Sequence, residues 1–95
     1  MNKISKDEFL KRLRCVHSAT SVNGAKYVSI QTNGRVCTGI RESTGSYFTI
    51  DVDKLYSAYY ELERINTKTL KKYVNSVQSP SLAILIEAKL AWKFL

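Results

Sequence analysis

The C-terminal stretch places the strongest constraint on the fold. Ser79-Pro80 predicts a helix start, because proline is favoured at the first helical position. Apolar side chains then fall on nearly every side of that helix: Leu82, Ala83, Ile84, Leu85, Ile86, Ala88, Leu90, Ala91, Trp92, Phe94 and Leu95. A helix that is apolar all round is buried on more than one side. In a 95-residue chain it is either the central core helix or, through Trp92, Phe94 and Leu95, part of a homodimer interface.

A first helix is predicted over about residues 6–18. Ser5 and Glu8 have the spacing of a capping box, in which the hydroxyl and the carboxylate each satisfy a free backbone amide. Apolar residues then recur at helical spacing: Phe9, Leu10, Leu13 and Val16.

Another helix is predicted over Val52–Ile65, with Asp51 or Asp53 as its cap. Its buried stripe follows the helical period: Leu55, Ala58, Tyr59, Leu62 and Ile65. A third helix starts after Asn66 or Thr67 and is described below with the basic residues.

The middle of the chain predicts antiparallel strands. Asn33-Gly34 is a strong hairpin signal, because both positions of such a turn require positive φ. A two-residue turn there sets Ile30 opposite Cys37 and Tyr27 opposite Ile40. With a second turn following, the predicted meander has three strands: Lys26–Thr32, Arg35–Arg41 and Ser46–Ile50.

The predicted order is α-β-β-β-α-α-α, an α+β fold in which an N-terminal helix precedes a three-stranded antiparallel meander and three helices. Residues 1–95 are expected to form one basic domain with one modest core, since chains of this size bury roughly 60–70% of their unfolded surface. The sequence shows no internal repeat, low-complexity segment or linker.

The charge balance favours an anionic partner. Fifteen lysines and arginines stand against eight aspartates and glutamates, a formal net charge of +7 that attracts polyanions. Two cysteines, Cys15 and Cys37, are too few for the disulfide framework of a secreted mini-protein. The first residues lack the apolar run of a signal peptide, and no stretch is apolar enough to span a membrane. We therefore expect a cytoplasmic protein with free thiols and no membrane association.

The third helix carries the most suggestive group of side chains. It is predicted from Asn66 or Thr67 to about Val77, with Leu70 and Tyr73 facing inward. A basic stripe is expected on its outer face, because residues three and four apart are neighbours on a helix: Lys68, Lys71, Lys72 and Asn75. Such a stripe between two other helices is typical of a helix-turn-helix arrangement that contacts phosphates and base edges. The alternative is a solvated lysine face on a core helix.

Further basic residues stand on the first helix and the hairpin: Lys11, Arg12, Arg14, Lys26, Arg35 and Arg41. If these groups and the basic helix merge in space, they form one electropositive surface that releases counterions from a nucleic acid. Several tyrosines are available to stack bases. Tyr56 and Tyr60 lie beside the buried stripe of their helix and are the better surface candidates, for a protein partner as much as for bases.

Residues that point to catalysis are few. His17 is the single histidine, and with Cys15 and Cys37 it gives only three soft ligands without a paired-cysteine motif, which disfavours zinc. Asp51 and Asp53 with Glu42 resemble the carboxylates of metal-dependent nucleases, but a helix cap explains the aspartates more simply. No glycine-rich phosphate-binding motif is present. We therefore expect neither an enzyme nor a cofactor.

Two functional hypotheses follow from these patterns. The first is a DNA-binding module that uses the basic helix and the hairpin. The expected partner is nucleic acid, with DNA favoured over RNA. The α-β-β-β-α order through Ile65 resembles double-stranded-RNA-binding domains in coarse topology, but Asp51, Asp53 and Lys54 stand where that family has a basic cluster, which argues against RNA binding in that mode. The second is a protein-interaction module, such as a small inhibitor or adaptor of a nucleic-acid enzyme. The exposed tyrosines and the apolar C-terminus favour this alternative.

Overall fold

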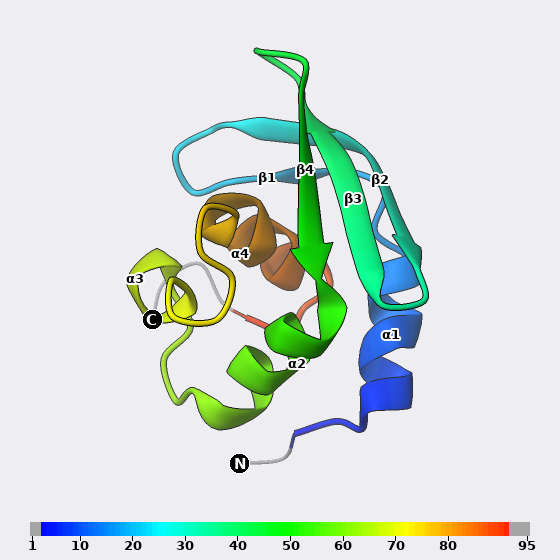
Figure 1. Cartoon of the computed structure of the whole chain (residues 1–95), viewed down its shortest axis with the longest axis vertical. Coiled ribbons are helices and arrows are strands. Elements are labelled where there is room, and N and C mark those ends of the chain that lie inside the picture. The colour runs from blue at the N-terminus through cyan, green and yellow to red at the C-terminus, as the bar shows by residue number, and fades with distance from the viewer. Residues whose placement is uncertain (1–2, 92–95) are drawn as a thin grey trace.

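The computed structural model describes residues 3–91 and has an α+β fold, as predicted (Figure 1). The helices are α1 (Lys6–Arg14), α2 (Val52–Glu61), α3 (Thr67–Leu70) and α4 (Gln78–Glu87). The sheet is antiparallel in the order β1-β2-β3-β4, with strands β1 (Ala19–Thr20), β2 (Lys26–Asn33), β3 (Val36–Arg41) and β4 (Ser46–Asp51). The element order matches the prediction except for β1, whose two residues are too short to give a sequence pattern.

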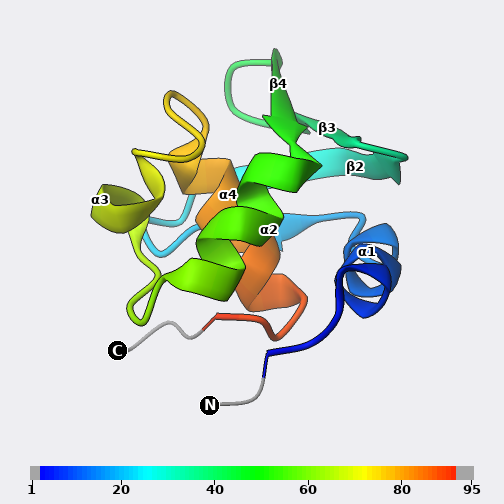
Figure 2. The same ribbon diagram turned by 60° about the horizontal axis from the view of Figure 1, so that its bottom comes forward.

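α4 is the central helix of the core. It packs against β1 and α3 and lies beneath the curved sheet (Figure 1, Figure 2). The four consecutive residues Leu82–Leu85 are buried, which confirms the core alternative. Pro80 lies in the first turn of α4, where backbone N–H groups have no partner within the helix. The predicted interface residues Trp92, Phe94 and Leu95 lie outside the described residues. Within residues 3–91, no helix has both the length and the apolar character needed to cross a membrane.

α1 ends at Arg14, earlier than the predicted end near residue 18. Its start is capped by Ser5, whose hydroxyl accepts a hydrogen bond from the Glu8 N–H at 3.2 Å. The Glu8 carboxylate does not complete the capping box and instead lies 3.4 Å from Nε of Arg12. After the helix, the Cys15 N–H donates to the Arg12 carbonyl in a tighter turn. The chain then enters β1, whose pairing with β2 overrides the helical periodicity.

The hairpin turn lies one residue later than predicted. Gly34 and Arg35 occupy the two turn positions, and Asn33 pairs with Val36. Gly34 has a φ of 61°, and a type II′ turn needs positive φ at this first position alone. A β-bulge at Ser29, where φ is 53°, then absorbs an extra residue of β2.

The later turn and the bulge together change the predicted register: the turn sets the pairs from Asn33 to Gln31, and the bulge shifts those from Val28 onward. Cys37 pairs with Thr32 instead of Ile30, and Tyr27 pairs with Arg41 instead of its predicted partner. Ile30 and Cys37 are nevertheless both fully buried. The bulge shifts the phase of the inward-facing residues, so the hydrophobic pattern of β2 survives the change of register.

α2 is capped by Asp51, one of its two predicted caps, whose carboxylate accepts a hydrogen bond from the Lys54 N–H at 3.1 Å. The helix ends at Glu61 rather than Ile65, because Leu62 adopts an extended backbone with ψ of 132°. Ile65 is still buried, since the turn that follows brings it back to the core.

α3 is a single turn, so the predicted helix to about Val77 is wrong. Asn66, one of its two predicted caps, caps the helix, and reciprocal hydrogen bonds of 2.9 Å join Asn66 and Thr69. The helix ends at Leu70, and turns follow until Ser76, whose φ of 75° reverses the chain before α4. A right-handed helix cannot include that left-handed conformation, so packing of the segment has overridden its helical periodicity.

The residues before α1 are fastened to α2. The Ile4 N–H donates to the Tyr59 hydroxyl, and the Tyr56 hydroxyl donates to the Ile4 carbonyl, both at 3.0 Å. Nζ of Lys3 donates to the Tyr59 carbonyl at 2.7 Å and lies 4.7 Å from the centre of the Tyr59 ring. Lys3 thereby satisfies a free carbonyl at the C-terminal end of α2.

Gly39 of β3 lies beneath the ring of Phe48, its partner in β4. A Cβ atom at Gly39 would overlap two ring atoms of Phe48 and lie 3.1 Å from Ile30. The Phe48 ring also meets Tyr27 edge-on, with ring centroids 5.5 Å apart. The missing side chain of Gly39 therefore leaves room for this aromatic contact.

We predict that Gly39→Ala lowers the free energy of unfolding by about 1–3 kcal/mol, the usual cost of overpacking a core. Urea denaturation followed by circular dichroism measures the change. In a Phe48→Leu background, where the ring is absent, the same substitution should cost less. Equal costs in both backgrounds would contradict the predicted overlap.

Candidate nucleic-acid interface

β4 forms one edge of the sheet and leaves backbone groups open. The Val52 N–H donates to the Arg35 carbonyl at 2.9 Å, just beyond the paired residues of β3 and β4. Hydrogen-bonded and non-bonded pairs alternate along an antiparallel ladder, so the N–H and C=O groups of Tyr47 and Thr49 point away from β3. Within residues 3–91 these four groups have no backbone partner.

The segment leading into α4 faces this edge across two hollows. The first has a volume of about 340 Å³, and its lining includes an arginine, an aromatic ring and hydroxyl groups: Arg41, Tyr47, Ser21, Ser46, Ser76 and Ser79. The second has a volume of about 350 Å³ and includes the polar residues Thr49, Asp51, Lys54, Lys72 and Asn75. On each wall, two consecutive residues line different hollows, Phe48 and Thr49 on β4 and Asn75 and Ser76 before α4, so the two hollows adjoin. Together the residues of these two hollows form what we call the β4-edge groove.

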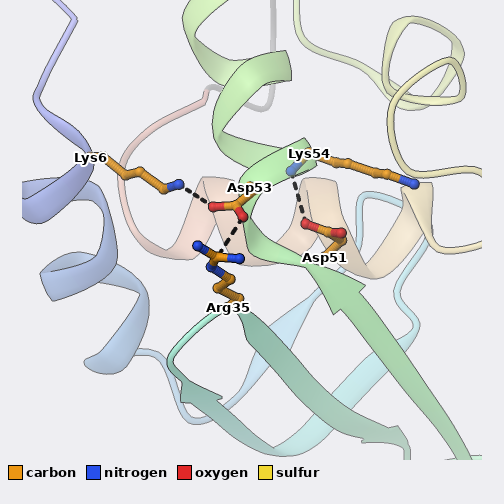
Figure 3. A network of polar contacts seen from close by, with 5 residues as sticks. All are labelled: Lys6, Arg35, Asp51, Asp53 and Lys54. Carbon is orange, nitrogen blue, oxygen red and sulfur yellow. Dashed lines mark hydrogen bonds and ion pairs between the residues drawn. The ribbon is translucent and has the colours of Figure 1, made fainter.

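Lys54 reaches the groove from the first turn of α2. Its backbone N–H is held by the carboxylate of Asp51, the last residue of β4. Its side chain extends toward the segment between α3 and α4 (Figure 3). Asp51 is thus both the last residue of β4 and the cap of α2, and this fixes the position of the Lys54 backbone.

The opposite wall is positioned by the turns that follow α3. The Leu70 carbonyl accepts hydrogen bonds from the N–H groups of Tyr73 and Val74, both at 2.9 Å, and Val74 is buried. The Tyr73 hydroxyl donates to the Glu61 carboxylate at 2.8 Å, which raises the pKa of Tyr73 and ties this wall to the end of α2. These contacts place the neighbouring Lys72 against the groove.

Cations outnumber carboxylates along the groove. Arg41, Lys54 and Lys72 line it with a single carboxylate, that of Asp51, which accepts the capping hydrogen bond. None of the three cations takes part in an ion pair among residues 3–91. Their charges are therefore free to meet an anionic ligand.

A second group of charges lies at the hairpin tip. Asp53 of α2 pairs with Lys6 of α1 and with Arg35, whose Nε lies 3.6 Å from the carboxylate (Figure 3). The hydrogen bond from Lys6, with the charges of Lys6 and Arg35, lowers the pKa of Asp53. Arg35 keeps 86% of its side chain exposed but is partly neutralised by Asp53.

Of the predicted binding residues, Arg41, Lys72 and Asn75 line the groove. Lys68 and Lys71 are exposed on α3 and at its C-terminal cap, outside both hollows. The prediction that Lys68, Lys71, Lys72 and Asn75 share one helical face is wrong, because α3 ends before three of them. The basic stripe is therefore not a recognition helix.

The basic residues of α1 do not join this set. Lys11 and Arg14 are exposed, and Arg12 pairs with Glu8. Both views place α1 and α3 on opposite sides of the molecule (Figure 1, Figure 2). Arg35 lies near α1, because Arg35 and Lys6 of α1 both pair with the carboxylate of Asp53. The basic residues are thus divided into two groups, and those of α1 do not merge with those of the groove into one electropositive surface.

Lys54 lines the groove but is missing from the residues predicted from sequence, and Tyr47 was there only one of several tyrosines available to stack bases. Nothing local distinguishes Lys54 from other lysines, since only the fold brings it near Lys72. Tyr47 had a usable signal, because Phe48 faces inward and alternation along a strand turns its neighbour outward. Tyr47 is 81% exposed. Of the tyrosines predicted at the surface, Tyr60 is exposed, whereas the neighbouring Tyr56 is half-buried with its hydroxyl bonded to the N-terminal segment.

The two aspartates considered for a metal site have structural explanations. Asp51 caps α2, and Asp53 holds two cations. No group of three potential metal ligands occurs within residues 3–91. Cys15 is exposed and Cys37 is buried, and burial raises the pKa of the Cys37 thiol, which disfavours its nucleophilic form.

Comparison with models of protein families, with curated proteins and with solved structures found no match for this chain. The chemistry of the groove is therefore inferred from its own residues. Its cations, hydroxyls and open backbone groups are suited to bind a polyanion, with Arg41, Lys54 and Lys72 as the charged contacts.

We predict that Asp53→Asn lowers stability at neutral pH and that the difference from the unsubstituted protein shrinks in acid. A lowered native pKa means that the carboxylate stabilises the fold above its unfolded pKa of about 3.9, and that this is lost as pH falls through the native pKa. Thermal melting across this pH range measures the effect.

Asp7→Asn is the matched control, because Asp7 is the second residue of α1 as Asp53 is of α2. It has no ion pair among residues 3–91, so its effect should depend less on pH. If both substitutions show the same pH dependence, the helix terminus and not the ion pairs of Asp53 is responsible.

Proposed function

We propose that this protein binds nucleic acid, with DNA favoured over RNA, through the β4-edge groove. The observation that carries the proposal is the row of three cations that have no acidic partner among residues 3–91: Arg41, Lys54 and Lys72. Cations that neutralise phosphates release condensed counterions, which supplies much of the affinity of such proteins. The net charge of +7 adds attraction at longer range.

The other groove residues have suitable chemistry for sugars and base edges. The amide of Asn75 and the hydroxyl of Ser76 offer donors and acceptors beside the cations. Ser76 has the positive φ noted above, and such conformations cluster at ligand sites. The preference for DNA is supported by Asp51 and Asp53 at the start of α2, where a double-stranded-RNA-binding domain would carry basic residues.

The proposed role is that of a binding module without a catalytic step, acting in the cytoplasm. The two thiols, with Cys15 exposed and Cys37 buried, fit a reducing compartment. Lys68 and Lys71, exposed near the C-terminal end of α3, supply additional positive charge around the bound polymer.

A protein-interaction module is the second candidate function. One observation favours it: the open N–H and C=O groups of Tyr47 and Thr49 at the edge of the sheet. An extended peptide can add to such an edge as a further strand.

We predict that replacing both Lys54 and Lys72 with alanine weakens DNA binding and lowers the slope of log affinity against log salt by about two, one for each lost phosphate contact. Fluorescence anisotropy with labelled DNA, titrated from about 50 to 200 mM salt, measures both quantities.

The double variant Lys11→Ala with Arg14→Ala removes the same charge from α1, on the other side of the molecule, and should change the slope less. Equal effects of the two variants would show attraction to the whole molecule and not a site at the groove. Absence of DNA binding at the lower salt concentration would overturn the proposal, and a stable protein complex in its place would support the second candidate.

A further inference from the structure

We infer that the nucleic acid held by the β4-edge groove is a single strand, with one base stacked on the ring of Tyr47. This inference rests on the proposed function and adds the form of nucleic acid that the site accepts. It is carried by the shape of the cationic surface, the position of Tyr47 and the open backbone groups of β4.

The cations of the groove line a recess, which suits a single strand better than a duplex. Proteins read duplex DNA by inserting an element into a groove, the major groove being about 12 Å wide. Arg41, Lys54 and Lys72 instead surround hollows of about 340 and 350 Å³ between two walls of the protein. The nearby α3 has four residues, too few for a recognition helix. Proteins that bind single strands characteristically track the backbone with a positively charged groove.

Tyr47 supplies the aromatic surface that such a groove needs. Its side chain is 81% exposed, the largest value among the exposed large apolar and aromatic residues. Single exposed aromatic residues are common, so the argument depends on its position. Tyr47 lies on the free edge strand at the rim of the recess that contains Arg41. Arg41 pairs with Ser46, the residue before Tyr47, so its side chain leaves the sheet on the opposite face from the Tyr47 ring. A strand that crosses the edge of β4 can therefore stack a base on the ring and place a phosphate at the cation.

The length of the groove fits a few nucleotides. From Tyr47 to Asp51, four strand steps of about 3.3 Å span about 13 Å. Stacked nucleotides advance about 3.4 Å along one strand, so this distance corresponds to about four nucleotides. The N–H and C=O groups of Tyr47 and Thr49 lie along this strand, have no backbone partner among residues 3–91, and can bond base edges. A second copy of the chain is a poorer occupant, because its own net charge of +7 repels the groove.

The test compares one labelled strand of about 12 nucleotides with the same strand annealed to its complement, by fluorescence anisotropy at about 50 mM salt. We expect tighter binding of the single strand. Tyr47→Ala should weaken that binding about five- to 150-fold, the range found when a stacking residue is truncated. Tyr47→Phe, which keeps the ring, should bind nearly as the unsubstituted protein does.

Tyr60→Ala is the matched control, because Tyr60 is 56% exposed on α2 and lines neither hollow. It should leave the affinity unchanged. Melting temperatures confirm that the variants are folded, which the exposure of Tyr47 and Tyr60 favours.

The outcomes separate this inference from the proposed function. If the duplex binds as tightly as the single strand and the Lys54 and Lys72 variant weakens both, the function stands and the inference fails. Unchanged affinity of Tyr47→Ala for the single strand also overturns the stacking contact. If neither form binds, both proposals fail. A peptide of alternating glutamate and valine that binds where the strand does not would show that the edge takes a protein segment instead.

Discussion

The burial of α4 is the constraint on which the rest of the structure depends. Leu82–Leu85 leave no side of that turn exposed, so other elements have to pack around it, among them β1 of the sheet and α3. The segment that enters α4 then runs past the free edge of β4, and Ser79 bonds the Tyr27 hydroxyl of β2 at 3.0 Å. The β4-edge groove is therefore a consequence of the packing around α4. Contacts within the protein hold its two walls in place without a ligand.

The two walls are fixed by separate contacts, and both are connected to α2. On one side, Asp51 ends β4 and caps α2, so the direction of the strand sets the start of the helix. On the other side, buried Val74 and the bond from Tyr73 to Glu61 hold the turns after α3. A site formed in advance loses less conformational entropy on binding, which favours affinity even when contacts are few.

Features encoded within a few residues were predictable from the sequence, and those that depend on distant contacts were not. The cap Ser5 was predicted, and Asp51 and Asn66 were each one of two predicted caps, because each satisfies an amide three residues away. The burial of α4 followed from its composition. The early end of α3 and the bulge in β2 depend on packing against other elements, which local periodicity does not contain. For the same reason, the charge pattern of the sequence could not show that Lys54 and Lys72 line the same groove. Nor could it show that the cations of α1 lie on the other side of the molecule.

The attachment of the N-terminal residues to α2 has a consequence for how the chain folds during synthesis. The Ile4 N–H finds its partner in the Tyr59 hydroxyl, 55 positions later in the chain. The residues before α1 therefore leave the ribosome long before α2, to which they bind, has been synthesised. α1 cannot reach its final packing until the sheet and α2 have formed. Such distant pairing slows folding compared with local contacts. The domain is accordingly expected to become resistant to protease only after most of it has left the exit tunnel.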